Sequence, residues 1–94
     1  MIHKDCCILI PFEITGRNAH KIVYSTQELK SSIYFKKDNR CINAKSLIGL
    51  LSLGIKKNDI ITVNFYADRE DVIDDDIQNI KKIINDIGSE CINE

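Results

Sequence analysis

The sequence contains little that interrupts regular structure. It has one proline, four glycines and no tryptophan in 94 residues, and no segment is repetitive or of low complexity. Linkers between domains are usually rich in proline, glycine and polar residues, so their scarcity predicts one domain that spans residues 1–94. No apolar run approaches the ~20 residues that a membrane-spanning helix requires, and no basic tract offers the charge that attracts nucleic acid.

Charge and cysteine pattern exclude further classes. With a net charge of −1 we expect no nucleic-acid or membrane partner, and the N-terminus lacks a signal-peptide layout, which predicts a cytoplasmic protein. The four cysteines form no CxxC motif, and His3 and His20 are not spaced as zinc ligands. We therefore expect reduced cysteines that pack as small hydrophobic side chains, with no metal and no cofactor.

Helical periodicity, runs rich in β-branched and aromatic residues, and turn signals together predict seven elements in the order β-α-β-β-α-β-α. A strand over residues 6–13 contains Pro11, which cannot donate a ladder hydrogen bond and therefore favours a sheet edge. A helix over 16–29 follows Thr15, a suitable N-cap. Asp68 can cap the last helix. The other predicted features are a hairpin of strands 31–37 and 40–43, a helix 47–53 that starts after Ser46 and stops at Gly54, a polar loop 56–59, a strand 60–66, and a helical stripe of Ile73, Ile77, Ile80, Ile84 and Ile87.

The hairpin between the helices predicts an antiparallel sheet with helices packed on one face, an α+β two-layer domain. Three further expectations concern polar residues. The acidic run of residues 74–76 is interpreted as a solvated face of the last helix. His20 is expected on a solvated face of the first helix, and His3 in a mobile terminus.

The segment 43–55, NAKSLIGLLSLGI, resembles the regulatory signature of the HPr family of the sugar phosphotransferase system, in which a Lys-Ser pair opens a short helix ending in Ser-Leu-Gly. Chain length and element order are similar as well. The resemblance implies an open-faced β-sandwich, with a four-stranded antiparallel sheet in the order 1-4-2-3 covered by three helices. It also implies a carrier or binding protein, and no enzyme.

A second HPr signature, Gly-(Leu/Ile)-His-Ala-Arg-Pro-Ala, aligns without a gap on residues 13–19. Arg17 is among the three matching positions, Thr15 occupies the position of the active histidine, and Asn18 replaces the proline. A gapped alignment instead puts Asn18 at the histidine position. A threonine hydroxyl is a weak nucleophile without an adjacent base, and its phosphate ester is stable, so we expect no phosphoryl relay. Arg17 could still bind an anion; the simpler roles are a helix cap for Thr15 and a surface arginine for Arg17.

Ser46 matches the regulatory serine of Gram-positive HPr proteins, which an ATP-dependent HPr kinase/phosphorylase modifies. In the family, the surface that corresponds to Leu47, Ile48 and Leu51 docks partners, among them a LacI-type catabolite control regulator. The alternative interpretation is that Ser46 only caps its helix and that Leu47 faces the core.

Three functions follow from the resemblance. The first is a regulatory module similar to the Crh-type catabolite-repression HPr proteins, controlled by phosphorylation at Ser46. The second is a divergent phosphocarrier that takes a phosphoryl group from enzyme I through His20 or another nucleophile. His20 lies five residues after Thr15, about 140° around the helix, and so away from that site. The third is a degenerate scaffold that is not modified at all.

Overall fold

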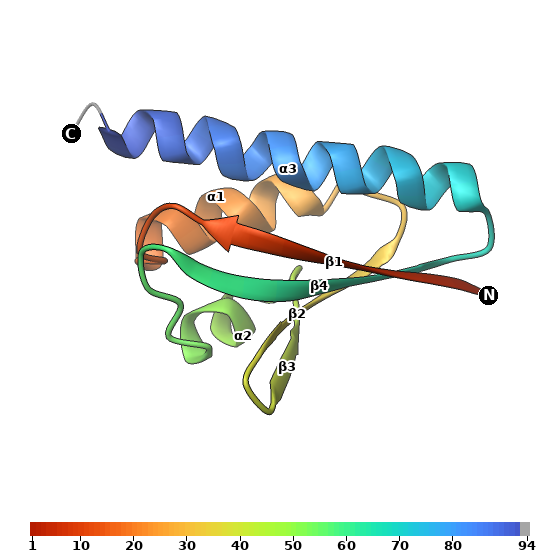
Figure 1. The fold of residues 1–94 in the computed structure, drawn as a ribbon. Coiled ribbons are helices and arrows are strands. Elements are labelled where there is room, and N and C mark those ends of the chain that lie inside the picture. Colours follow the sequence, from red (N-terminus) through yellow and green to blue (C-terminus); the bar gives the residue numbers. More distant parts are fainter. Residues whose placement is uncertain (93–94) are drawn as a thin grey trace.

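The chain folds into one antiparallel sheet with three helices beside it (Figure 1). The structure is a computed structural model that describes residues 1–92. In chain order the elements are β1 (Ile2–Ile10), α1 (Gly16–Thr26), β2 (Ser32–Lys37), β3 (Arg40–Asn43), α2 (Leu47–Ser52), β4 (Asp59–Ala67) and α3 (Glu70–Ile92). Within these 92 residues, no helix combines the length and the apolar character that crossing a bilayer would demand.

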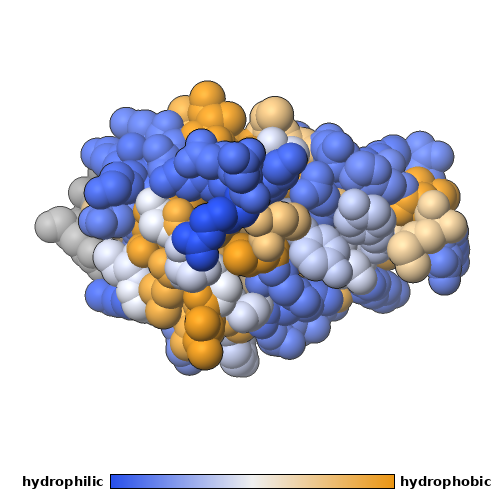
Figure 2. Space-filling model, turned by 90° about the horizontal axis from the view of Figure 1, so that it is seen from below, coloured by the Kyte–Doolittle hydropathy of each residue, from blue (hydrophilic) through white to orange (hydrophobic). Residues whose placement is uncertain are grey.

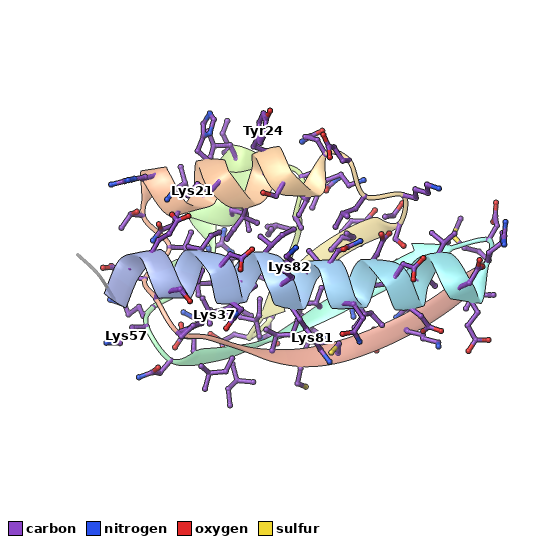
Figure 3. The ribbon with its side chains drawn as sticks, turned by 90° about the horizontal axis from the view of Figure 1, so that it is seen from above. Lys21, Tyr24, Lys37, Lys57, Lys81 and Lys82 are labelled. Atoms are coloured by element: carbon purple, nitrogen blue, oxygen red, sulfur yellow. The ribbon has the colours of Figure 1, made fainter. Side chains whose placement is uncertain are left out.

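The sheet has the strand order β1-β4-β2-β3, which confirms the predicted α+β open-faced sandwich. All three strand pairings are antiparallel. The long helices α1 and α3 lie side by side on one face of the sheet, as Figures 1 and 3 show from two directions. The short helix α2 lies at one end of the sheet and contacts α1 and β3.

The core lies between the sheet and the helices. Along β4, residues Ile61, Val63 and Phe65 are buried, while the residues between them point to the open face. This alternation is typical of an antiparallel sheet that is covered on one side only. The isoleucine stripe of α3 packs on the same core; Ile77 is half-buried, and the other four are buried: Ile73, Ile80, Ile84 and Ile87.

Strand β1 differs from the prediction at both ends. It begins at Ile2 and ends at Ile10, so Pro11 lies just outside the strand, although β1 is at an edge as expected. The early start follows from pairing with β4, because His3 lies opposite Tyr66 and its ring stacks on the tyrosine ring at a centroid distance of 4.5 Å. The prediction that His3 lies in a mobile terminus was therefore wrong.

Two helix boundaries also differ from the prediction. Helix α1 ends at Thr26 and not at residue 29, because the hydroxyl of Thr26 donates to the carbonyl of Val23 and the chain turns there. Leu29 still packs against the core after the turn, so its apolar character was correctly noticed but wrongly attributed to the helix. Helix α3 begins at Glu70, two residues after Asp68, so Asp68 does not directly precede it as an N-cap would.

The acidic run of α3 is only partly solvated, which corrects the prediction. Asp74 and Asp75 are exposed, but Asp76 is 4% exposed. Its carboxylate accepts a hydrogen bond of 2.7 Å from the backbone N–H of Ser31. Asp76 lies three residues after Ile73 in the helix and therefore falls on the buried side. The α1–β2 connection is thus fixed to the middle of α3.

Candidate functional site

The first candidate site is the N-terminus of α1. Thr15 is its N-cap, as predicted, and its hydroxyl accepts from the backbone N–H of Asn18 at 3.3 Å. The Thr15 carbonyl accepts from the N–H of Ala19 at 2.9 Å, which is the first bond of the helix. The preceding residue is tied to the loop before β4, since the N–H of Ile14 donates to the carbonyl of Ile55. This network presents the exposed Thr15 at a hydrogen-bonded helix start.

Asn18 is buried beside this helix start, and its side chain is hydrogen-bonded there. It is 8% exposed, and its side-chain amide donates to the carbonyl of Glu13 at 2.8 Å. The thiol of Cys91, near the end of α3, contacts the Asn18 side-chain oxygen at 3.9 Å. No local pattern in the sequence reveals this support, because 73 residues separate Asn18 from Cys91.

An open hollow of about 280 Å³ lies beside Thr15. Thr15, Asn18 and Cys91 contribute to its wall, and Lys57 from the loop before β4 adds a positive charge. His20 is not among the residues that line it. His20 is exposed on α1, as predicted.

The charges near this helix start are linked to α3. The side-chain hydrogen bond that Lys21 donates to Glu90 lowers the pKa of that carboxyl, and the charge of the exposed Arg17 adds a smaller effect in the same direction. Figure 3 shows Lys21 on the side of α1 that faces α3. Arg17 and Lys21 thus form a basic edge next to Thr15.

The second candidate site is the start of α2. Ser46 is the N-cap of this helix, and its hydroxyl accepts from the backbone N–H of Gly49 at 3.1 Å. Position 49 leaves little room for a side chain, because a Cβ there would lie 3.2 Å from both the Ser46 hydroxyl and the Cβ of Ile42. At the other end of the helix, Gly54 has φ +61°, a conformation that favours glycine. This confirms the predicted helix stop.

The apolar side chains of α2 divide into two sets. Leu50 is buried, whereas Leu47 is 37%, Ile48 82% and Leu51 44% exposed. We call Leu47, Ile48 and Leu51 the α2 patch. Figure 2 shows hydrophobic surface gathered at the end of the molecule where α2 lies. The α2 patch beside Ser46 is therefore exposed, as expected. Leu47 does not face the core.

The two candidate sites share a distinctive charge environment. Residues 14–27 and 39–58, which contain α1 and α2, include no aspartate or glutamate. Six acidic residues instead fall between positions 68 and 76, around the start of α3. The basic residues of the two acid-free segments are Arg17, Lys21, Arg40, Lys45, Lys56 and Lys57. The segments that contain α1 and α2 therefore carry an excess of basic residues despite the near-neutral net charge.

Of the four cysteines, Cys91 lies beside the start of α1. All four are free thiols; Cys6 and Cys91 pack against the core, and Cys7 and Cys41 are exposed. In the part of the chain that the structure describes, no three histidine, cysteine, aspartate or glutamate side chains come together as metal ligands.

Comparison with known proteins identifies relatives of this chain. Residues 3–86 match the family model described as the PTS HPr component phosphorylation site. The HPr-like protein Crh of Halalkalibacterium halodurans is 32% identical over 63 residues, which cover 67% of this chain and 75% of Crh. The structure of HPr-C-His from Thermoanaerobacter tengcongensis superposes with a TM-score of 0.69 and 27% identity, covering 87% of this chain and 96% of that one. The phosphocarrier protein HPr from Bacillus anthracis str. Ames gives 0.62 and 26% identity, with coverages of 78% and 88%.

Proposed function

The chain belongs to the HPr family, and from that premise we propose that it is a regulatory, Crh-like binding module controlled by phosphorylation at Ser46. HPr proteins are carriers and binding partners and not enzymes. The observation that carries the proposal is the geometry at α2, where the hydroxyl of Ser46 caps the helix beside the exposed α2 patch.

A phosphate on Ser46 suits its surroundings. Phosphoserine carries a charge of about −2 near neutral pH. At this position the charge lies at the positive end of the helix dipole, where the backbone N–H of Gly49 already donates to the serine oxygen. Modification would therefore change the electrostatics of this surface while it retains an acceptor at the helix cap.

The α2 patch is the proposed docking surface. Its three side chains expose apolar area where a partner could bury it, and burial of apolar area drives most protein association. The surrounding acid-free segments favour an acidic partner surface before modification. Phosphorylation adds negative charge beside the α2 patch, so one surface can discriminate between two classes of partner.

The chemistry of Thr15 supports a module that does not relay phosphoryl groups. Thr15 is exposed at the start of α1, whereas Asn18 is buried and hydrogen-bonded to Glu13. A phosphoryl acceptor must be accessible, so this difference favours the ungapped alignment, in which Thr15 occupies the histidine position. Its hydroxyl accepts a backbone N–H and has no base beside it in that network.

The decisive experiment is phosphorylation with HPr kinase/phosphorylase and ATP, followed by intact mass spectrometry. We expect one added phosphate in the native chain and none in Ser46→Ala. Ser52→Ala is the matched control, since Ser52 is an exposed serine in the same helix, and this variant should still be modified. An unmodified native chain, or modification that persists in Ser46→Ala, would refute the proposal.

The proposed partner of the phosphorylated form is a LacI-type catabolite control regulator. Binding should be measured by calorimetry with the unmodified and the serine-phosphorylated chain. The proposal requires tighter binding of the phosphorylated form, and equal affinities would contradict it.

Two observations favour a second function, that of a divergent phosphocarrier. The matching family model is defined by a phosphorylation site, and Arg17 is retained next to Thr15. Phosphoenolpyruvate and enzyme I should then yield an acid-labile phosphoprotein, and His20→Ala should lose the label if His20 is the acceptor. Absence of label in the native chain would exclude this function.

A further inference from the structure

A hydrogen-bonded connection joins the end of α1 to the residue before Ser46. The ammonium of Lys45 donates to the backbone carbonyl of Leu29 at 2.8 Å. The side-chain amide of Gln27 donates to the carbonyl of Lys45 at 3.1 Å. We call these two bonds the Lys45 latch. It links two segments that lie 16 to 18 residues apart in the sequence, and both bonds involve Lys45, the immediate neighbour of Ser46.

Fixed anchors border the latch on both sides. Before it, the hydroxyl of Thr26 lies within hydrogen-bonding distance of the Ala44 carbonyl, at 3.4 Å in the buried interior. After it, the N–H of Ser31 donates to the buried carboxylate of Asp76 in α3. The segment between the anchors, residues 27–30, follows the end of α1 and is itself outside regular structure. If the latch changes, residues 27–30 should therefore move, and the displacement should end at Ser31.

The Lys45 ammonium is the group in this network that a phosphate on Ser46 would attract. Its current acceptor is a neutral carbonyl, whereas a phosphoserine offers a dianion with three acceptor oxygens on the adjacent residue. Charge-assisted bonds to a phosphate are roughly twice as strong as bonds between neutral groups. The lysine side chain has a flexible four-carbon stem, so it can exchange one acceptor for the other without a backbone rearrangement.

We propose that phosphorylation of Ser46 opens the Lys45 latch at its ammonium bond: the ammonium leaves the Leu29 carbonyl for the phosphate, the bond from Gln27 to the Lys45 carbonyl alone holds the two segments, and residues 27–30 respond. The inference rests on the proposed modification of Ser46 for its biological use. It adds that the modification alters the surface at the end of α1 as well as the charge at the start of α2. A partner that contacts both helices would then meet two changes produced by one phosphate.

The test installs phosphoserine at position 46 during protein synthesis, so that no kinase is needed. The carbonyl ¹³C shift of Leu29 and the amide ¹⁵N shift of Lys30 report the hydrogen bond at the Leu29 carbonyl. We expect both shifts to move, on phosphorylation, most of the way to their values in unphosphorylated Lys45→Met, which has no ammonium. In Lys45→Met itself, phosphoserine should leave the Leu29 shift unchanged.

Two controls complete this double-mutant cycle. Lys30→Met removes a positive charge from the same segment without touching the latch, and the Leu29 response to phosphoserine should persist in it. Lys45→Gln repeats the neutral substitution if Lys45→Met folds poorly. Shifts confined to residues 43–50, or a Leu29 response that survives in both Lys45 variants, would overturn the latch. A chain that no kinase modifies but whose latch opens with installed phosphoserine would refute only the proposed function.

Discussion

The α2 patch yields a quantitative prediction for Ile48→Asp. Ile48 is the second residue of α2 and is 82% exposed, so it contributes little to the core. Aspartate in the first turn of a helix interacts favourably with the helix dipole. We therefore expect the free energy of unfolding to change by no more than about 0.5 kcal/mol, the usual range for surface substitutions.

The effect on binding should be much larger. Full burial of an isoleucine side chain contributes roughly 1.5–3 kcal/mol, and about four-fifths of this one is still available to a partner. Covering it should contribute about 2 kcal/mol, which corresponds to roughly 30-fold in affinity. The aspartate would also have to be desolvated in the interface, so a loss of about 30-fold is a lower estimate.

The assay combines urea denaturation with calorimetric binding of the serine-phosphorylated chain to the proposed regulator. Ile60→Asp provides the matched control, because Ile60 is an exposed isoleucine of β4, outside the α2 patch. The control should bind with native affinity. If Ile48→Asp binds as tightly as the native chain, the α2 patch is not the docking surface. If it unfolds the protein, the assignment of Ile48 as a surface residue is wrong.

Three other substitutions test the fold around the candidate sites. Asp76→Ala removes the acceptor of the buried Ser31 N–H and should lower the free energy of unfolding by about 1–3 kcal/mol; a loss below about 0.5 kcal/mol in urea denaturation would show that this bond does not hold the α1–β2 connection. Gly54→Ala places a side chain at φ +61° and should cost about 1–2 kcal/mol in the same measurement, and an unchanged midpoint would contradict the helix stop. The backbone N–H of Lys56 lowers the pKa of Asp59, so the ionised carboxylate stabilises the fold above its unfolded pKa, and this contribution is lost as the pH falls through the lower folded pKa. The stability difference between the native chain and Asp59→Asn should therefore be present at neutral pH and vanish in acid, and a difference independent of pH would refute this linkage.

Much of the architecture could be predicted from local patterns. Richness in β-branched and aromatic residues located β4. The isoleucine stripe located α3, because its spacing follows directly from the geometry of a helix. Cap chemistry located the helix starts at Thr15 and Ser46, since a side-chain oxygen there satisfies an otherwise unpaired N–H. The stop at Gly54 follows from its tolerance of positive φ.

Other boundaries depended on contacts between distant segments. The first strand begins at Ile2 because β4 pairs with it, and no apolar run in the sequence marks that start. Asp76 looked like a member of an acidic surface cluster, and the N–H of Ser31, 45 residues earlier, explains why it is buried. A carboxylate alone does not reveal which donor satisfies it.

The sequence by itself determined the chemistry available at the two helix starts: a threonine at one, a Lys-Ser pair at the other, and no acidic residue in either segment. Only the tertiary structure decided how these groups are connected. It buried Asn18 beneath Thr15, exposed the α2 patch beside Ser46, and bonded Lys45 to the end of α1. The reason is physical: residue type sets which bonds a side chain can make, whereas the packing of distant elements sets which partners come within reach.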